Sequence, residues 1–190
     1  MDVLRIAAFS DGNTGGNPAG VVIGEVLPDA ADMQRVAAEV GFSETAFAAR
    51  EGDGWRVRYF SPESEVPFCG HATIALGAAL VRNFGDGIFK LLLNQAAITV
   101  EGFRDGTNFA ALFHTRNPSA SGGVYEDPAT GAATAAFAGY LRDIDWPHGG
   151  AIDIVQGEDM GMRSRLHADI PPTLGASIRV SGTARLMDAG

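Results

Sequence analysis

Two short stretches of this chain resemble each other, and this internal repeat constrains the fold more than any other feature. Residues 70–80 read GHATIALGAAL and residues 131–141 read GAATAAFAGYL, with five of the eleven positions identical. Both stretches are rich in small residues, begin with glycine and follow a loop that contains proline and acidic residues. The repeat therefore predicts a duplicated unit in which each half is built around one small-residue helix.

The first residues of the two predicted helices favour the binding of an anion. Gly70 and Gly131 have no side chains, so the first backbone N–H groups of each helix are open to a ligand. Free N–H groups and the positive end of the helix dipole both favour negative charge. If the two helix starts face one crevice, they can hold a carboxylate. The structural alternative, two tightly packed central helices surrounded by strands, is compatible with this interpretation.

The rest of the chain consists of strand-like segments with few helices. An apolar stripe at positions 33, 36, 37 and 40 has helical spacing and predicts a helix that starts at Pro28-Asp29 and stops at Gly41. Strand-like runs cover residues 3–9, 19–26, 45–50, 55–60, 88–93, 97–101, 108–113, 152–156, 166–170 and 177–186. Because these strands do not alternate regularly with helices, the sequence predicts an α+β fold.

Composition and charge exclude several classes of protein. Hydrophobic residues make up 46% of the 190 residues and charged residues 19%, so the chain can build a core and is not disordered. A net charge of −9 argues against nucleic-acid and anionic-membrane partners. The single cysteine excludes an internal disulfide and fits a reducing compartment. Since no leader-like segment opens the chain and residues 72–81 are too short to span a bilayer, we expect a cytoplasmic protein.

Four motifs, in this order along the chain, resemble those of the PhzF family of phenazine-biosynthesis isomerase-like proteins. They are NPA with VV at 17–22, SETAF at 43–47, VPFCGHAT at 66–73 and EDPATG at 126–131, and the tail at 156–161 and 178–180 is similar to the family's C-terminal strands. The resemblance implies a diaminopimelate-epimerase-like fold, with two pseudo-symmetric halves that each wrap a sheet around a central helix. It also implies an isomerase without a cofactor, a small-molecule substrate and a homodimer.

The chain departs from the family in length. Family members are usually much longer, and the two helix-opening glycines are only 61 residues apart here. The missing material falls near residues 114–115, so we expect a first half at 1–113 and a shortened second half at 114–190. A shortened half-sheet exposes unpaired strand edges and apolar surface, which favours a partner chain that completes it.

The resemblance assigns proton transfer to Glu44, with His71 and Asp127 beside it. Glu44 lies in an apolar segment, where burial makes a carboxylate hold its proton more tightly, but a surface glutamate at a strand end is the alternative. At a helix start the dipole disfavours the imidazolium, so a neutral His71 can relay a proton, or simply cap or pack. Asp127 precedes Pro128 and is either part of the site, an N-cap, or both.

Further residues limit the chemistry. Ala132 stands where the family commonly has serine, so its backbone N–H can still bind an anion while proton handling suffers. Related racemases use two cysteines, but only Cys69 is present and Thr130 holds the matching place in the repeat. This excludes a two-thiol racemase and favours a packing role for Cys69. His114, His148 and His167 show no metal-ligand spacing with Cys69 or with each other, and no dinucleotide motif is present, so we expect neither metal nor cofactor.

These observations lead to one main functional hypothesis. The chain is expected to be a PhzF-like isomerase that moves a proton on a small carboxylate-bearing metabolite, with Gly70, Gly131 and Ala132 holding the carboxylate. The alternatives are a non-catalytic binding or structural relative that has lost the active crevice, and a hydrolase or lyase that uses the same acid/base groups.

Overall fold

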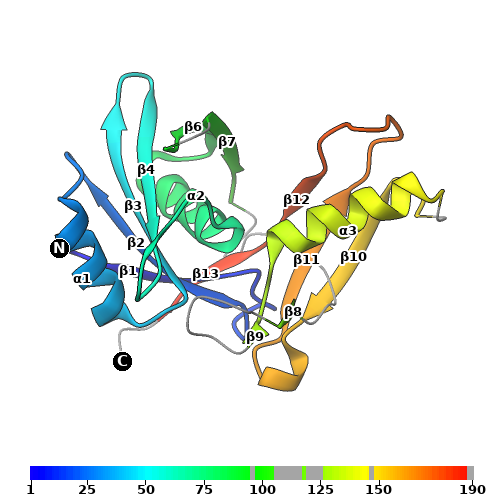
Figure 1. Cartoon of the computed structure of the whole chain (residues 1–190), viewed down its shortest axis with the longest axis horizontal. Helices are drawn as coiled ribbons and strands as arrows, with labels where there is room; N and C mark the ends of the chain where they lie inside the picture. The colour runs from blue at the N-terminus through cyan, green and yellow to red at the C-terminus, as the bar shows by residue number, and fades with distance from the viewer. Residues whose placement is uncertain (95–96, 105–116, 119–125, 146–147, 188–190) are drawn as a thin grey trace.

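Two lobes, each with one central helix, make up the protein (Figure 1). The computed structural model describes residues 1–94, 97–104, 117–118, 126–145 and 148–187. Helix α2 (Gly70–Phe84) lies in the first lobe, helix α3 (Gly131–Asp143) lies in the second, and both begin at the predicted glycines. The predicted α+β class, with helices and a mixed set of strands, is confirmed.

The first lobe is an eight-stranded mixed sheet in the order β13-β1-β2-β3-β4-β6-β7, with β5 beside β4. Its strands are β1 (Leu4–Ala8), β2 (Asn17–Gly24), β3 (Glu44–Glu51), β4 (Gly54–Phe60), β5 (Glu65–Val66), β6 (Gly87–Leu92), β7 (Ala97–Gly102) and β13 (Ala184–Leu186). Two neighbouring pairs run parallel, β2 with β3 and β4 with β6. Helix α1 (Ala30–Val40) connects the first pair, and α2 connects the second.

The two faces of this sheet carry different helices. On one face, Met33, Val36 and Ala37 of α1 pack against buried apolar side chains of β2, β3 and β4. On the other face, α2 is buried along most of its length against β1, β2, β3, β6, β7 and β13. Since successive side chains of a strand point to opposite faces of the sheet, alternate residues can pack against α1 and the residues between them against α2. Helix α1 has the predicted ends, because the Asp29 carboxylate accepts the Asp32 N–H and Gly41 adopts φ 72°.

The second lobe has a smaller sheet than the first, and part of its helix α3 stays exposed. Strands β10 (Ala151–Gln156), β11 (Ser164–Asp169) and β12 (Arg179–Ser181) form an antiparallel sheet, with the short helix η1 (Glu158–Met160) between the first two. A two-stranded pair, β8 (Asn117–Pro118) and β9 (Glu126–Asp127), completes the described elements. Phe137 and Tyr140 of α3 and Ile144 just after it are 44–57% exposed, which confirms the expected exposed apolar surface.

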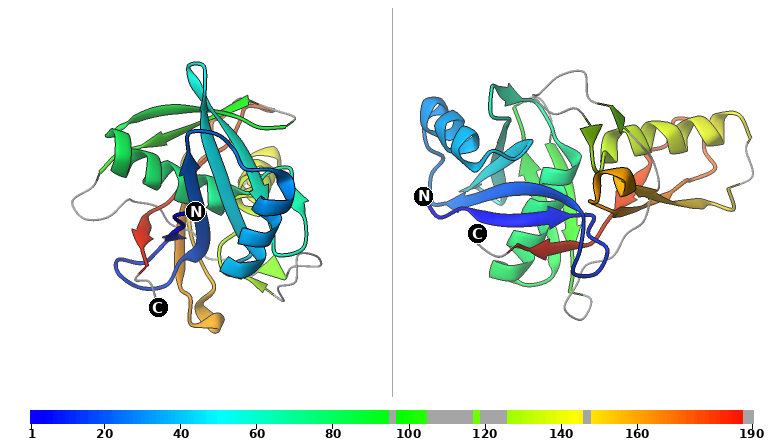
Figure 2. Two further views of the ribbon diagram at one scale, coloured as in Figure 1. Left: turned by 90° about the vertical axis from the view of Figure 1, so that its left-hand side faces the viewer. Right: turned by 90° about the horizontal axis from the view of Figure 1, so that it is seen from below.

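The C-terminal tail crosses from the second lobe back to the first (Figure 2). Residues 177–186 were expected to form continuous strand, but β12 pairs with β11 whereas β13 pairs with β1. The chain changes sheets at Gly182, where an added Cβ would lie 1.9 Å from the ring of Phe9, so only glycine allows this close passage.

Some predictions fall outside the described residues. These are the strand at 108–113 and the division between 113 and 114, which stays a prediction. Within the described part of the chain, no helix combines the length and apolar character needed to cross a membrane.

Candidate active site

The starts of the two central helices touch, which is the arrangement that a shared carboxylate site would require. A Cβ added at Gly70 would lie 3.5 Å from the Gly131 Cα and 3.7 Å from the Ala132 nitrogen. The residues before the helices, Cys69 and Thr130, do not cap them with their side chains. The three residues predicted to bind a carboxylate are therefore neighbours, with two positive helix ends brought together.

Glu44 and His71, predicted as proton-transfer residues, also meet. Glu44 begins β3 and His71 is the second residue of α2, and the Glu44 Oε2 lies 3.4 Å from the His71 Nε2. The Ser43 hydroxyl lies 3.3 Å from the same ring nitrogen. The side chains of His71 and Glu44 are 3% and 19% exposed, so this acid–imidazole contact is largely shielded from water.

Asp127 lies close enough to His71 and Glu44 for their charges to affect its pKa, and two side chains donate hydrogen bonds to its carboxylate. The Asn17 amide donates to its Oδ1, and the Thr130 hydroxyl donates to its Oδ2 at 2.6 Å. Burial raises the pKa of Asp127, and the nearby Glu44 carboxylate raises it further, whereas His71 and the Thr130 hydroxyl act in the opposite direction. Because Thr130 is the N-cap position of α3, the alternative interpretation of Asp127 as that cap residue is not supported.

Two positioning residues were not recognised as such from the sequence. Asn17 is 1% exposed and also donates to the Ala129 carbonyl at 3.1 Å, which ties β2 to the loop before α3. The Gln156 amide donates to the Asp127 backbone carbonyl at 2.5 Å and accepts the Thr130 N–H at 3.2 Å. Both residues lie in motifs that resemble the family, but nothing in the local sequence pairs them with Asp127.

The geometry brings three potential metal ligands together, and one of them, the Cys69 thiol, is in a site that favours its protonated form. Donor atoms of Glu44, Cys69 and His71 all lie within 4.8 Å of one another. Burial above all, and then the Glu44 charge, raises the pKa of the Cys69 thiol well above its usual value, so it keeps its proton. The expectation that no metal is needed stays a prediction.

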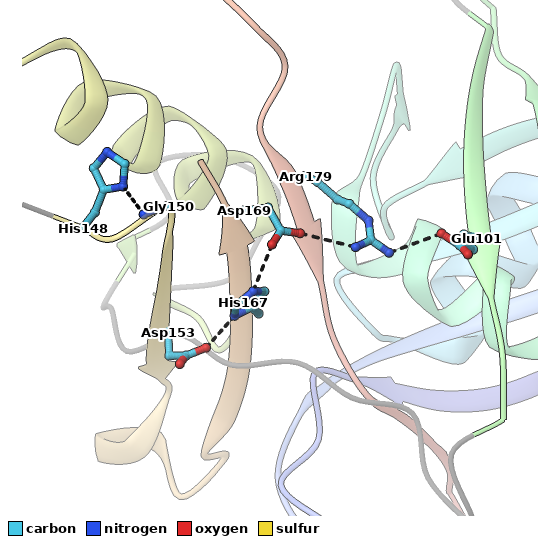
Figure 3. Close-up of polar contacts among 7 residues, drawn as sticks. All are labelled: Glu101, His148, Gly150, Asp153, His167, Asp169 and Arg179. Atoms are coloured by element: carbon cyan, nitrogen blue, oxygen red, sulfur yellow. Dashed lines mark hydrogen bonds and ion pairs between the residues drawn. The ribbon is translucent and has the colours of Figure 1, made fainter. Parts of the chain in front are cut away.

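The histidines of the second lobe have other polar partners (Figure 3), and His167 with Asp153 lines a cavity that Gly70, Gly131 and Ala132 also line. His148 accepts the Gly150 N–H, and His167 lies 2.6 Å from Asp153 and 3.3 Å from Asp169. His114 lies outside the described residues.

A cavity of about 830 Å³ is lined by one group of predicted site residues and not by the other. Gly70, Gly131 and Ala132 line it, together with apolar side chains of α2, β7 and β12, but Glu44, His71 and Asp127 do not. Arg179 of β12 and Glu101 of the first lobe also line it, and Arg179 bridges Glu101 at 3.2 Å and Asp169 of the second lobe at 3.3 Å (Figure 3). The predicted binding residues thus face this cavity, and the predicted proton-transfer residues do not.

Two helix-centred lobes whose helix starts meet define an epimerase-like fold, and solved structures share it. A predicted epimerase from Pseudomonas aeruginosa superposes with a TM-score of 0.83 at 19% identity, covering 98% of this chain and 96% of that one. A PhzF-family protein from Enterococcus faecalis gives 0.75 at 18% identity, covering 98% and 96%. A probable proline racemase from Agrobacterium radiobacter gives 0.60 at 11% identity, covering 96% and 88%. At these identities the likeness shows the fold alone.

Sequence comparison then identifies the family. The family model described as phenazine biosynthesis-like protein, PhzC-PhzF, matches residues 6–97 and 92–190, so the chain belongs to this family. An uncharacterized isomerase of Pseudomonas aeruginosa is 34% identical over 126 residues, which is 66% of this chain and 48% of the relative. The uncharacterized isomerase YddE of Salmonella typhimurium is 33% identical over 174 residues, 88% of this chain and 54% of the relative. The chain spans about half the length of the curated relatives it matches.

Proposed function

We propose that this protein is a cofactor-independent isomerase that moves a proton on a small carboxylate-bearing metabolite. The observation that carries this proposal is the shielded contact between the Glu44 carboxylate and the His71 ring, 3.4 Å apart at the start of α2. A carboxylate positioned beside an imidazole in this way is suited to general acid–base catalysis, in which it takes a proton and later returns it. Membership in a family whose relatives are named isomerases supports the same reaction class.

In the proposed reaction, the first N–H groups of the two central helices hold the substrate carboxylate through Gly70, Gly131 and Ala132. Glu44 removes a proton from a substrate carbon, and the electron pair left behind is delocalised toward the bound carboxylate. The protonated Glu44 then returns the proton to another atom of the same molecule, so substrate and product have equal mass. His71 stabilises the Glu44 carboxylate before the first step and again after the second.

Asp127 has a supporting role in this proposal. Because burial raises its pKa, the carboxyl holds a proton more readily than an exposed aspartic acid. A protonated Asp127 donates a hydrogen bond to the developing negative charge on the substrate, and its ionised form does not. The role requires that the loop before α3 stays attached to the first lobe through Asn17.

The test is exchange of substrate protons with solvent. A panel of small carboxylates is incubated in D₂O with the full chain, and deuterium uptake is followed by NMR and mass spectrometry. Glu44→Gln is expected to abolish uptake, whereas the matched control Glu51→Gln, an exposed residue at the other end of β3, is expected to retain it. Full retention of uptake in Glu44→Gln would remove Glu44 from the mechanism.

A non-catalytic binding protein is the alternative, and the cavity favours it. The residues that would hold a carboxylate line the 830 Å³ cavity, but the three proton-transfer candidates do not. Ala132 also lacks the hydroxyl that the family resemblance leads one to expect. This alternative predicts carboxylate binding by calorimetry without deuterium uptake by any ligand that binds. A hydrolase or lyase would instead be recognised by a change in product mass.

We also propose a homodimer in the cytoplasm. The single cysteine suits a reducing compartment. The exposed apolar side chains of Phe137, Tyr140 and Ile144 form one stripe along α3, and such a stripe is costly to leave in water. Light scattering after size-exclusion chromatography is expected to give the mass of a compact dimer, and Tyr140→Glu is expected to give a monomer. A monodisperse wild-type monomer would contradict the dimer.

A further inference from the structure

Cys69 lies beside both members of the proposed catalytic pair, with the donor atoms of Glu44, Cys69 and His71 all within 4.8 Å of one another. Its Sγ lies 3.2 Å from the Nδ1 of His71, while the Nε2 of the same ring faces Glu44. The Cys69 side chain is buried, and it directly precedes Gly70 at the start of α2. The proposed reaction assigns no role to this thiol, although it is the polar contact recorded at Nδ1, whereas Glu44 and Ser43 contact Nε2.

The two ring nitrogens of a neutral imidazole are not equivalent, because one carries the proton and the other a lone pair. If Nε2 carries the proton, it donates to the Glu44 carboxylate and leaves the Nδ1 lone pair facing Cys69. If Nδ1 carries the proton, the Nε2 lone pair faces the carboxylate, and the two acceptors repel each other. The arrangement around the ring therefore favours the first tautomer, provided that a donor faces Nδ1.

We propose that Cys69 is a positioning residue whose thiol donates a hydrogen bond to the Nδ1 of His71 and so keeps the Nε2 proton directed at Glu44. The catalytic consequence rests on the proposed function, but the tautomer does not. Ser43 does not replace this contact, because its hydroxyl lies beside Nε2 rather than Nδ1.

The protonation of the thiol supports this assignment. Burial, and after it the Glu44 charge, raises the pKa of Cys69, so at neutral pH the sulfur carries the proton that it needs to donate. The other titratable groups near the thiol are Asp127 from β9 and Tyr59 from β4. The Asp127 charge also favours the protonated thiol, and burial raises the pKa of Tyr59, which keeps that side chain neutral.

The direct test is the tautomer of His71, read from the ¹⁵N shifts of its ring in the full chain. His71→Gln assigns its signals. The wild type is expected to show a protonated Nε2 and an unprotonated Nδ1 that accepts a hydrogen bond. Cys69→Ala is expected to move both shifts toward a mixture of tautomers, and Cys69→Ser, which keeps a donor, is expected to restore the wild-type shifts. A protonated Nδ1 in the wild type would overturn the proposal without any variant.

A second readout connects the tautomer to the reaction. Cys69→Ala is expected to slow deuterium uptake about two- to tenfold, the effect of one neutral hydrogen bond, and Cys69→Ser is expected to recover the rate. Val81→Ala, a cavity-forming change at the far end of α2, controls for loss of stability and is expected to leave the tautomer unchanged. Unchanged shifts in Cys69→Ala would refute the assignment. If Glu44→Gln instead retains uptake, the proposed function fails while the tautomer result still stands.

Discussion

Replacing Asn17 with alanine tests whether one amide holds the two lobes in register at the candidate site. Asn17 lies at the start of β2, is 1% exposed and donates to both the Asp127 carboxylate and the Ala129 carbonyl. These partners come from the loop before α3, more than a hundred residues away in sequence. Asn17→Ala removes both donors at once and leaves a buried carboxylate with one fewer hydrogen bond.

The expected cost follows from the type of each hydrogen bond. A bond to a charged acceptor contributes about 1.5–3 kcal/mol and a neutral one about 0.5–1.5 kcal/mol. We therefore expect Asn17→Ala to lower the free energy of unfolding by about 2–4 kcal/mol at neutral pH. The exposed Asn13, in the loop just before β2, provides a matched control, and Asn13→Ala is expected to change stability by less than about 0.5 kcal/mol.

The pH dependence of this loss has a defined sign. The folded-state pKa of Asp127 is raised, so its ionisation opposes folding, and its contribution is lost as pH rises above the ordinary aspartate value. The Asn17 amide favours the ionised form, so its removal raises the pKa of Asp127 further. Asn17→Ala should therefore cost more at pH 8 than at pH 4, where the carboxyl is protonated.

The assay is urea denaturation of the wild type, Asn17→Ala, Asp127→Ala and the double variant at both pH values. A coupling energy of about 1–2 kcal/mol between the two sites is expected at pH 8. The reasoning is refuted if the two losses are additive, or if Asn17→Ala is as stable as Asn13→Ala.

Two further predictions concern packing and charge. Gly182→Ala should destabilise the fold by about 1–3 kcal/mol, because its Cβ would lie 1.9 Å from the buried ring of Phe9. The control Gly87→Ala places its Cβ in open space and should leave stability unchanged. Equal melting temperatures of the two variants would contradict this prediction. Hydrogen bonds, first to Asp153 and then to Asp169, raise the pKa of His167 in the folded protein. The stabilisation from protonated His167 is therefore complete below the ordinary histidine pKa of about 6.5 and is lost as pH rises through the folded-state pKa. His167→Gln should therefore lower the free energy of unfolding, measured in urea, at pH 6 but not at pH 9. The loss should be less than about 1 kcal/mol since the side chain is a third exposed, and an equal effect at both pH values would contradict the assignment.

Local features of the fold could be predicted because their causes lie close together in the sequence. Helix α1 ends at Gly41 and is capped by Asp29, as expected from an apolar stripe with stop and start signals at its ends. The two small-residue helices begin at Gly70 and Gly131, where the repeat begins. The expected run at 177–186 was divided between two sheets, because strand pairing depends on partners far away in the chain.

The candidate site was predictable as a set of residues but not as an arrangement. The contact between Glu44 and His71 agrees with the roles that the resemblance implied. Neither the Asn17 donor to Asp127 nor the Cys69 thiol beside the His71 ring has a local signal. Both contacts arise when β2, β9 and the start of α2 converge.

The sequence by itself determined the elements: two glycine-led helices of small residues, alternating strands, and an acid in an apolar segment. Helix and strand formation follow from side-chain periodicity, capping and backbone freedom, which act over a few residues. Only the tertiary structure decided that the helix starts touch, that Asp127 docks on Asn17, and that the glycines predicted to bind a carboxylate line a cavity which Glu44 does not line. These outcomes depend on distances between distant segments, and hydrogen bonds form only when packing brings donor and acceptor within about 3 Å.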